Sequence, residues 1–412
     1  MTSNPSIPSN PGNPRTPADP VNPGKPTRDL LFPELGDSIE SRISWFQHMQ
    51  KNEPLRFRPE YNLWEVFRYE DVQHVLKNPD IFSVTSKTHM GLPFSFGRAD
   101  IPEHRFLRGF VGRSFVPGNI ERQAPEFTAM VDSLLEPALR TGGMEMLGEF
   151  CYPLMERVVA DMFGLRIPGV GRFREWSDQM FGQLIGVRSP DHADVVQMFR
   201  EQLEARKHTP GDDLMSALLA ERGKDDRLAE EKIIHMCLDL ATAGNAPLSL
   251  MLGYAFARFC RDPEFFQTLR KDPSLIPGAI EEILRYDFSW FNLWRAARHD
   301  TVLGGHEIEA GQHVVVWDSS ANFDESHFPQ AERFDIRRSP NPHLTFGQGM
   351  YICLGLPLVR VLGRIVLERI VTSFSDIRFD AEKPLTSLDR MKDYLVSLDV
   401  VLTPAQAKAT AL

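Results

Sequence analysis

Apolar residues recur every three to four positions along most of the chain after residue 30, a spacing that predicts amphipathic helices. Short runs bounded by turn residues, which are typical of strands, are fewer. The chain is therefore expected to be mainly α with a minor β region. The predicted helices cover residues 70–78, 118–140, 145–163, 168–186, 190–206, 212–222, 228–261, 277–286 and 356–371; the predicted strands lie within 55–58, 63–67 and 296–317, with a final strand pair within 394–402.

The first 28 residues contain eight prolines, one at every third position from Pro5 to Pro26. Such a segment buries little apolar surface and favours an extended chain without internal hydrogen bonds. We predict a disordered proline-rich tail over residues 1–28. Residues 29–412 show no linker and no internal repeat, so we expect them to form a single domain, large for one hydrophobic core.

The composition argues against several classes of protein. Apolar residues make up 42% and charged residues 25% of the chain, as in ordinary globular proteins, and the net charge of −10 argues against nucleic-acid binding. The four cysteines are far apart in the sequence, which favours a reducing compartment over a disulfide framework. The most apolar long stretch, residues 236–260, is interrupted by Asp239, Asn245 and Pro247. We therefore expect a cytoplasmic protein without a membrane span.

A single cysteine among glycines carries the strongest chemical signal. Residues 346–355 read Phe-Gly-Gln-Gly-Met-Tyr-Ile-Cys-Leu-Gly, and an apolar helical pattern follows. Glycines let backbone N–H groups approach the Cys353 sulfur, and these groups together with a helix N-terminus favour a thiolate over a thiol. A thiolate held in this way is a suitable ligand for iron.

This spacing resembles the haem-binding loop of the cytochrome P450 family, in which Phe-x-x-Gly-x-x-x-Cys-x-Gly carries the thiolate that ligates the haem iron. The resemblance implies the cytochrome P450 fold, haem b as cofactor and Cys353 as its axial metal ligand. It also places Phe346, Gly347, Tyr351 and Gly355 at the haem. Tyr351 departs from the family, which usually has histidine or arginine there, because a phenol can hydrogen-bond a haem propionate but cannot neutralise it.

Four further side chains stand where the resemblance implies contacts with the haem propionates. His104 and Arg108 are four residues apart, so one face of a helix presents both. Arg295 begins the predicted β region, and His343 precedes the cysteine loop. Each alone is more often a solvated surface charge, but all four occur in the order that the resemblance implies.

A second motif implies a structural network. Glu282 and Arg285 are spaced for an ion pair on one helix, and Arg333 lies in a Glu-Arg-Phe run further along the chain. The resemblance implies that these three residues form a buried network beneath the haem. A buried charged network must be fully paired, so loss of Arg285 is expected to abolish folding or haem uptake.

The long helix over residues 228–261 departs from the family at the oxygen-activating position. The family usually places an acid followed by an alcohol there to relay protons, whereas this chain has Ala246 and Pro247. The nearest hydroxyls, those of Thr242 and Ser249, point elsewhere at 3.6 residues per turn. The alternative is that Pro247 only accentuates a distortion of the helix. The positions assigned to catalysis are Gly244, Asn245, Ala246 and Pro247.

Several reactions are compatible with this departure. Monooxygenation is the default, with protons supplied by the substrate or by ordered water. Hydrogen peroxide replaces dioxygen and a reductase in family branches with proline at the alcohol position, but those fatty-acid branches have an arginine where this chain has Ala246. Oxidative coupling or cyclisation without net oxygen insertion is a third reaction. A haem-binding protein without turnover is a remote further alternative.

Residues 84–99 and 288–294 are expected to line the substrate side of the cavity. The second segment has four aromatic residues in seven, which favours an aromatic or peptide-derived substrate from specialised metabolism. The alternative is that some of these rings pack the core instead. The residues assigned to the pocket are Phe94, Phe96, Ala243, Ser289, Trp290, Phe291 and Asn292.

Arginines flank the motifs that the resemblance places on the proximal side, where a redox partner would bind. They could form a basic docking surface for an acidic ferredoxin or another electron donor, which a peroxide-driven enzyme would not need. The alternative is that they are scattered surface charges. These residues are Arg105, Arg113, Arg337, Arg338, Arg360 and Arg364.

Overall fold

The computed structural model describes residues 38–84, 96–165, 193–223, 228–288, 292–383, 385–388 and 391–406 of the chain. The predicted tail over residues 1–28 and the predicted helix over residues 168–186 lie outside the described residues. Within the described residues the protein is mainly α-helical with small sheets, which confirms the predicted fold class. The number of domains stays a prediction.

Helix α11 is the longest helix of the described chain, with 32 residues from Glu230 to Arg261. The other helices are α2 (Ile39–Asn52), α3 (Tyr69–Lys77), α4 (Glu103–Val111), α5 (Pro117–Arg122), α6 (Ala124–Thr141), α7 (Tyr152–Phe163), α9 (Ala193–His208), α10 (Leu214–Arg222), α12 (Pro263–Lys271), α13 (Ile276–Tyr286), α14 (Asp318–Ala321) and α15 (Leu356–Ser373).

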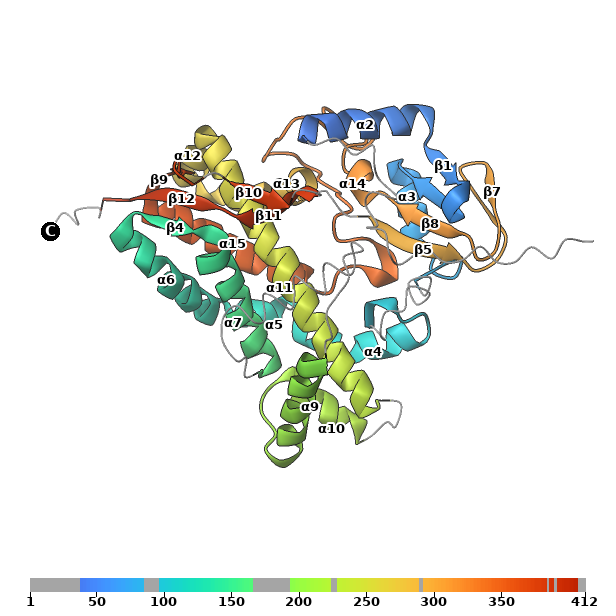
Figure 1. The fold of residues 1–412 in the computed structure, drawn as a ribbon, viewed down its shortest axis with the longest axis horizontal. Coiled ribbons are helices and arrows are strands. Elements are labelled where there is room, and N and C mark those ends of the chain that lie inside the picture. The colour runs from blue at the N-terminus through green and yellow to red at the C-terminus, as the bar shows by residue number, and fades with distance from the viewer. Residues whose placement is uncertain are drawn as a thin grey trace, which may run out of the picture.

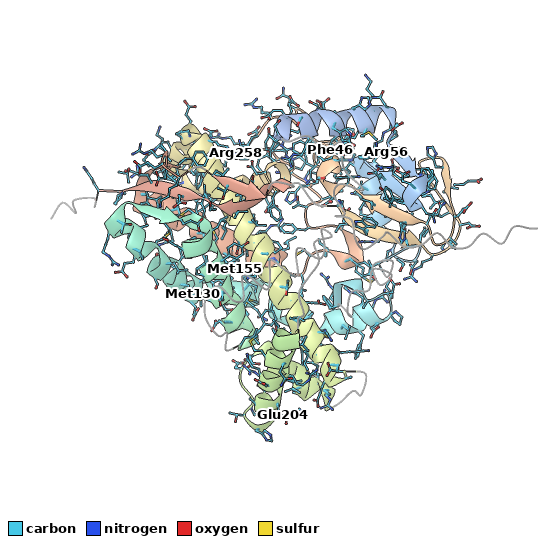
Figure 2. All side chains as sticks on the ribbon, in the orientation of Figure 1. Phe46, Arg56, Met130, Met155, Glu204 and Arg258 are labelled. Carbon is cyan, nitrogen blue, oxygen red and sulfur yellow. The ribbon has the colours of Figure 1, made fainter. Side chains whose placement is uncertain are left out.

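Helix α11 crosses the centre of the molecule (Figure 1). It packs against α7, α9, α12 and α13, and Figure 2 shows Met155 of α7 beside it. Pro247 lies inside α11, where a proline removes one backbone donor at a cost of roughly 3 kcal/mol in a regular helix. The helix is retained because burial of its apolar residues on several sides outweighs that cost.

A five-stranded sheet with the order β1-β2-β8-β5-β3 forms most of the β region, at the upper right of Figure 1. Strands β2 and β8 pair in parallel, with Leu63 opposite His313 and Val66 opposite Val316, and the other neighbours are antiparallel. The three valines of β8 are buried, so this strand forms the middle of the sheet and of its apolar layer. The strands are β1 (Leu55–Arg58), β2 (Leu63–Val66), β3 (Phe82–Ser83), β5 (Leu293–Ala297) and β8 (His313–Val316).

The C-terminal strands do not pair as the sequence predicts. The predicted pair within residues 394–402 corresponds to β11 and β12, which follow one another in the chain but belong to different sheets. Strand β11 pairs with β10, whereas β12 lies between β4 and β9. Local pattern could not reveal the distant partner β4. The bounds are β4 (Gly143–Glu145), β6 (Thr301–Leu303), β7 (His306–Ile308), β9 (Phe374–Phe379), β10 (Thr386–Leu388), β11 (Met391–Ser397) and β12 (Asp399–Pro404).

Two predicted helices are interrupted in the structure. Residues 118–140 form two helices, α5 and α6, which meet at Gln123. Pro125 lies in the first turn of α6, where backbone N–H groups have no partner within the helix, so a proline is tolerated there. Residues 145–163 begin with a π-helical turn, Met146–Cys151, before α7. The Glu145 side chain accepts hydrogen bonds from the first N–H groups of that turn, so the helix pattern begins later than its apolar spacing suggests.

Buried apolar side chains form two clusters. The larger surrounds α11 and includes residues of α6, α7 and α15. The other lies between α2, α3 and the five-stranded sheet and includes Phe46, which Figure 2 shows on α2, and Trp317. Leu344 belongs to this second cluster and Leu358 to the larger one, so the cysteine loop between them runs from one cluster to the other.

Candidate active site

The cysteine loop has a backbone conformation that depends on glycine. Gly347 and Gly349 have φ of 67° and 72°, in the left-handed region that other residues rarely adopt. The Cys353 N–H donates a hydrogen bond to the Phe346 carbonyl at 2.9 Å and closes the loop. A Cβ on Gly349 would lie 2.9 Å from the Leu76 carbonyl oxygen, because α3 packs closely against the loop. This loop places Cys353 immediately before α15.

The surroundings of the Cys353 sulfur act on its charge in opposite directions. Burial raises the pKa of the thiol above its ordinary value, while the N–H groups of Gly355 and Leu356 and the Arg108 guanidinium lower it. The two N–H groups come from the beginning of α15, as expected for a helix N-terminus. A coordinated metal cation would overcome the effect of burial, because a coordinating thiol loses its proton.

Cys353 lines a cavity of about 330 Å³. The cysteine loop and α15 form one wall and α11 another, while β5 and the beginning of α14 add a third. Most of the lining side chains are apolar. Among the described lining residues, Arg295 and Asp318 carry ionisable groups of opposite sign.

Helix α11 presents small and apolar side chains to the cavity. Gly244 and Pro247 line it, whereas Asn245 and Ala246 are buried in the helix packing and do not. Of the four positions assigned to catalysis, the structure therefore brings two to the cavity. Within the described part of the cavity wall, α11 contributes no acid and no alcohol. Its lining residues are Ala243, Gly244, Pro247, Leu248 and Met251.

The two hydroxyls nearest to Pro247 along α11 are bonded elsewhere. The Thr242 hydroxyl donates to the Leu238 carbonyl at 2.9 Å, within the helix. The Ser249 hydroxyl donates to the Cys151 carbonyl at 3.3 Å, on the buried side that faces α7. Neither residue lines the cavity, so neither replaces the missing alcohol.

Two polar residues, Arg295 and Tyr351, line the loop side of the cavity, and His104 lies behind Tyr351. His104 is buried, its Nδ1 lies 3.2 Å from the Phe96 carbonyl oxygen, and its Nε2 is buried without a hydrogen-bond partner. The Arg295 guanidinium is also buried and donates to the Trp294 carbonyl at 2.8 Å. Burial lowers the pKa of Arg295 to about 10, which leaves it charged at neutral pH.

Tyr351 connects these residues. Its hydroxyl donates to the Ala99 carbonyl at 3.1 Å, and its ring lies 4.3 Å from the His104 ring and 5.5 Å from the centre of the Arg295 guanidinium. Burial raises the pKa of Tyr351 to about 12, so the phenol is neutral. This side of the cavity therefore has a neutral donor where the family usually has a cation.

His343 does not line the cavity, and its place among the haem contacts stays a prediction. Its Nε2 lies 3.3 Å from Glu281 Oε2, and the Arg360 guanidinium binds the same carboxylate at 2.7 Å. Burial by itself would raise the pKa of Glu281, but hydrogen bonds and charge from His343 and Arg360 lower it to about 2. The His343 ring therefore contacts an acid of α13.

Glu282 and Arg285 form the predicted ion pair on α13, and both are fully buried. Arg285 donates to both Glu282 oxygens, at 2.9 and 2.7 Å. Its remaining bonds are to backbone carbonyls of three residues that are distant in the sequence: Asn322, Ala331 and Arg333. One guanidinium thus joins α13 to the chain that leads to the cysteine loop.

The part played by Arg333 differs from the sequence-based expectation. Arg333 contributes its carbonyl oxygen, at 3.1 Å from Arg285, whereas Arg338 supplies the second cation, with Nε 3.5 Å from Glu282 Oε1. Asn341 donates to the same carboxylate at 3.0 Å. Sequence reasoning missed Arg338 and Asn341 in this role, because neither has a helical spacing to Glu282.

The predicted substrate residues are only partly described. Phe94, Ser289, Trp290 and Phe291 lie outside the described residues. Phe96 is buried and stacks on the His104 ring at 4.9 Å, and Asn292 accepts a hydrogen bond from the Trp294 indole, so neither lines the cavity. Ala243 lines it, together with Phe288 and Trp294.

Asp318 is the ionisable lining residue that sequence reasoning missed. It follows β8 and begins α14, its side chain is buried, and its Oδ1 has no hydrogen-bond partner. The sequence feature that could have identified it is an acid directly after the apolar run 314–317, because an acid is rarely buried without a partner.

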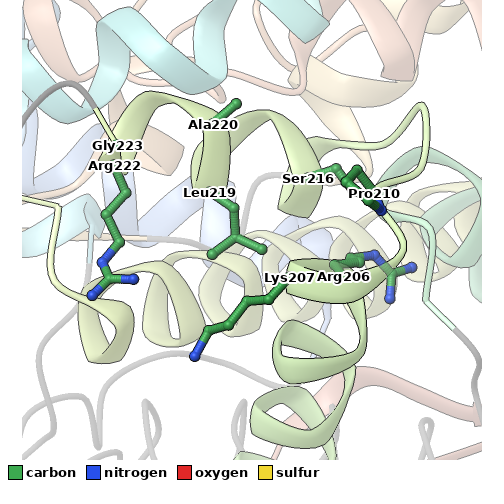
Figure 3. A pocket seen from close by; sticks show the side chains of 8 residues that line it. All are labelled: Arg206, Lys207, Pro210, Ser216, Leu219, Ala220, Arg222 and Gly223. Carbon is green, nitrogen blue, oxygen red and sulfur yellow. The ribbon is translucent and has the colours of Figure 1, made fainter.

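A second hollow of about 520 Å³ lies between α9 and α10, and Figure 3 shows Arg206, Lys207 and Arg222 on its walls. Each of these cations is already paired with an acid: Arg206 with Asp213 at 2.9 Å, Lys207 with Glu204 and Glu230 at 2.6 and 2.9 Å, and Arg222 with Glu230 at 2.6 Å. The chemistry therefore concentrates in the cavity at Cys353.

The residues around that cavity fit a haem. Cys353 offers a sulfur ligand for the iron, and the apolar wall suits a large ring. The buried Arg295 guanidinium is a donor suited to the haem carboxylates, since buried donors are normally satisfied. Among the described residues, no helix is long and apolar enough to span a membrane.

Comparisons with known proteins agree with this geometry. The protein-family model described as Cytochrome P450 matches residues 172–408. Putative cytochrome P450 YjiB of Bacillus subtilis strain 168 is 30% identical over 342 residues, which cover 80% of this chain and 86% of the relative. Steroid C26-monooxygenase of Mycobacterium tuberculosis strain H37Rv is 29% identical over 394 residues, which cover 92% of this chain and 98% of the relative.

A solved structure extends the likeness to three dimensions. A mutant of P450 EryK in complex with erythromycin B superposes on this chain with a TM-score of 0.81 at 26% identity, and the match covers 91% of this chain and 100% of that chain. The likeness therefore covers nearly the whole fold around the cysteine loop.

Proposed function

This chain belongs to the cytochrome P450 family of haem enzymes and is an oxidoreductase of the monooxygenase class, and from this premise we propose that the cavity would hold haem b, with Cys353 as the protein ligand of its iron. The observation that carries the proposal is the position of the Cys353 sulfur, on the cavity wall at the beginning of α15. When bound, a haem with a thiolate ligand supplies an iron centre that can activate oxygen.

The polar residues of the cavity suit the orientation of the haem. Arg295 would bind a haem carboxylate with its charge, whereas His104 would donate to one through Nε2 only as the doubly protonated ring, because its Nδ1 proton faces the Phe96 carbonyl. Tyr351 would support both through its ring contacts. Arg108 acts on the Cys353 sulfur, where a cation favours the thiolate that iron requires.

We infer that protons reach the reacting oxygen from the substrate or from ordered water. Gly244 and Pro247 face the cavity from α11 and carry no exchangeable side-chain proton. Ala246, at the position of the family's acid, is buried away from it. The distal wall can therefore shape the space in which oxygen and substrate meet, but it cannot relay a proton through a side chain of these residues.

The described lining favours a mainly apolar substrate with a ring system. Phe288 and Trp294 present aromatic surface, and Ala243 leaves room beside α11. An aromatic or peptide-derived molecule from specialised metabolism fits this lining. The relatives are named for a steroid reaction and, in one solved complex, for erythromycin B, so the family accepts ring-bearing molecules of different kinds.

An acidic ferredoxin is the electron donor that the surface charges favour, but fewer arginines are available than the sequence suggests. Arg360 and Arg364 bind Glu281 and Glu121, and Arg338 belongs to the buried network. Three others are exposed and are the candidates for docking: Arg105, Arg113 and Arg337.

The test compares oxidants with purified holoenzyme. One arm supplies ferredoxin, ferredoxin reductase, reduced nicotinamide cofactor and ¹⁸O-labelled dioxygen; the other supplies hydrogen peroxide alone. A steroid, erythromycin B and a tryptophan-containing cyclic dipeptide are the probes. We expect products with one labelled oxygen atom in the first arm. Cys353→Ala should abolish turnover in both arms, whereas Cys260→Ala, on the far part of α11, should retain it; equal turnover of the two variants would refute the haem-thiolate site.

A peroxide-driven reaction or an oxidative coupling is the second candidate function. Pro247 at the cavity wall favours it, because neither reaction needs the alcohol that this position lacks. Turnover in the peroxide arm alone would replace the first candidate by a peroxygenase. A product that has lost hydrogen and contains no labelled oxygen would establish coupling or cyclisation.

A further inference from the structure

Asp318 is a buried acid on the wall of the haem cavity. Its residue exposure is 2%, and its Oδ1 atom has no hydrogen-bond partner. A buried polar atom without a partner is destabilising, and a ligand that enters the cavity can supply the missing partner. The proposed role of haem in this cavity does not use Asp318.

The strand pairing explains which groups Asp318 faces. Strands β5 and β8 are antiparallel neighbours, with Arg295 opposite Val314 and Leu293 opposite Val316. Asp318 follows two residues after Val316 and begins α14, directly beyond the end of β8 that pairs with Leu293. Leu293, Arg295 and Asp318 all line the cavity, which shows that they face the same space.

Arg295 is the charged group that acts on Asp318 among the described residues. Tyr351 and Asp100 act on Arg295 from its other neighbours, and Asp100 is itself paired with Arg298 at 2.8 Å. Helix α2, which packs against α14, brings the uncharged Gln50, whose amide donates to Ser320. Helix α3 also packs against α14 but supplies no charge that acts on this acid.

These surroundings favour the neutral acid. Burial raises the pKa of Asp318 well above its ordinary value, and the N–H groups of Asp318 and Ser319 and the charge of Arg295 only partly oppose this. A neutral carboxylic acid can donate one hydrogen bond, which a carboxylate cannot. The cavity wall thus has a cation, Arg295, beside a neutral acid donor.

We propose that Asp318 donates its carboxyl hydrogen to the same haem carboxylate that Arg295 binds, and so positions the haem and couples its charge to pH. A cationic substrate is the other ligand that an acid could bind, but Arg295 would repel it and a neutral acid would not attract it. The inference rests on the proposed haem site, where Tyr351 provides a neutral group at the position that is usually a cation.

The pH dependence follows from the charge of the acid. Below its raised pKa, Asp318 is neutral and donates to the haem carboxylate. As the pH rises through that pKa, Asp318 becomes negative beside Arg295 and the haem carboxylate, and negative charge near the iron favours the oxidised, more positive metal. The reduction potential of the haem should therefore fall as the pH rises.

The test measures two properties of the haem in holoenzyme, neither of which depends on turnover. Potentiometric titrations over the whole pH range in which the holoenzyme keeps its haem give the reduction potential. Transfer of haem to apomyoglobin gives its release rate. The variants are Asp318→Asn, Asp318→Leu and the control Glu65→Gln, which removes a buried acid of β2 that bonds Arg56 and Trp317 and does not line the cavity.

We expect the wild-type potential to fall with pH, and Asp318→Asn to lose much of that slope. Asp318→Leu should release haem at least about threefold faster than wild type, the effect of one lost hydrogen bond, while Asp318→Asn, which still donates through its amide, should lie between them. Glu65→Gln should match wild type in both measurements. The thiolate–haem absorption spectrum is recorded first for every protein. A protein without this spectrum contradicts the proposed haem site, whereas one with it tests the role of Asp318 alone.

Three results would overturn the proposal: a wild-type potential independent of pH, an unchanged slope in Asp318→Asn, or wild-type haem release from Asp318→Leu. An Asp318→Asn enzyme that keeps the slope but no longer binds benzylamine would assign the acid to a cationic substrate and would also overturn it. Should neither variant fold, the wild-type profile decides, since a flat potential refutes the role and a falling one supports it.

Discussion

Replacement of Arg285 by alanine is expected to leave the protein unable to fold. Both members of the Glu282–Arg285 pair are fully buried, and the guanidinium makes two bonds to the carboxylate and three to backbone carbonyls. Alanine keeps the helix but removes every one of these donors. The carboxylate then retains the Asp335 N–H and the Asn341 amide, together with the long contact to Arg338.

The magnitude follows from what remains buried. Breaking a buried ion pair by removal of one partner costs about 3–5 kcal/mol. Each of the three carbonyls left without its donor adds about 1–3 kcal/mol if water cannot reach it. Together these losses are on the order of 6–14 kcal/mol, comparable with the roughly 5–15 kcal/mol that stabilises a typical protein.

The assay is urea unfolding followed by circular dichroism, with haem content measured on the same samples. Arg285→Lys keeps a charge but not the planar fork, so it should also lose most of the carbonyl bonds and fold poorly. The matched control is Arg360→Ala, because Arg360 binds the neighbouring acid Glu281 but is half exposed, and exposed pairs contribute about 0–1 kcal/mol. If Arg285→Ala lost less than about 2 kcal/mol and retained haem, the argument from buried pairing would be refuted.

Further changes test the helix, the acid dependence and the loop. Pro247→Thr should raise the thermal midpoint, since it restores a helix donor, and an unchanged or lower midpoint would show that α11 is adapted to proline. Glu281→Gln should remove part of the acid sensitivity: the pKa of Glu281 is lowered from 4.5 to about 2, so its stabilisation is present above about pH 4.5 and is lost as the pH falls toward about 2. Urea unfolding midpoints measured across this pH window check the prediction, and parallel plots of midpoint against pH for variant and wild type would contradict it. Gly349→Ala should destabilise more than Gly305→Ala: positive φ costs both about 1–2 kcal/mol, but only the Gly349 side chain would meet the Leu76 carbonyl, and equal losses of unfolding free energy would exclude that clash.

The local sequence pattern was sufficient to predict elements whose hydrogen-bonding partners lie close in the chain. The apolar spacing of residues 228–261 and 277–286 predicts α11 and α13 closely, because helix hydrogen bonds join neighbouring residues. The pairing of β12 with β4 depends instead on segments more than half the chain apart, which local pattern does not contain. The π-helical turn before α7 likewise depends on the Glu145 side chain, and a periodic pattern does not distinguish it from an α-helix.

The site divides in a similar way. The structure brings Cys353, Arg295 and Tyr351 to one cavity, and these could be predicted because a motif of fixed spacing and order identifies them. His343 and Asp318 could not be placed, for opposite reasons. His343 lies next to the motif but contacts an acid of α13, whereas Asp318 belongs to no motif and reaches the cavity at the beginning of α14, after the strand that pairs with β5.

By itself the sequence determined the chemistry of the loop: one cysteine, the glycines that let the chain turn around it, and the absence of an acid and an alcohol at residues 246 and 247. These features are fixed by residue identity and short spacing, which folding does not alter. The tertiary structure decided which groups share a cavity and which are bonded to partners elsewhere. It buries Ala246, commits Arg338 to Glu282 and leaves an Asp318 oxygen unpaired beside Arg295, because burial and pairing depend on contacts between residues that are far apart in the chain.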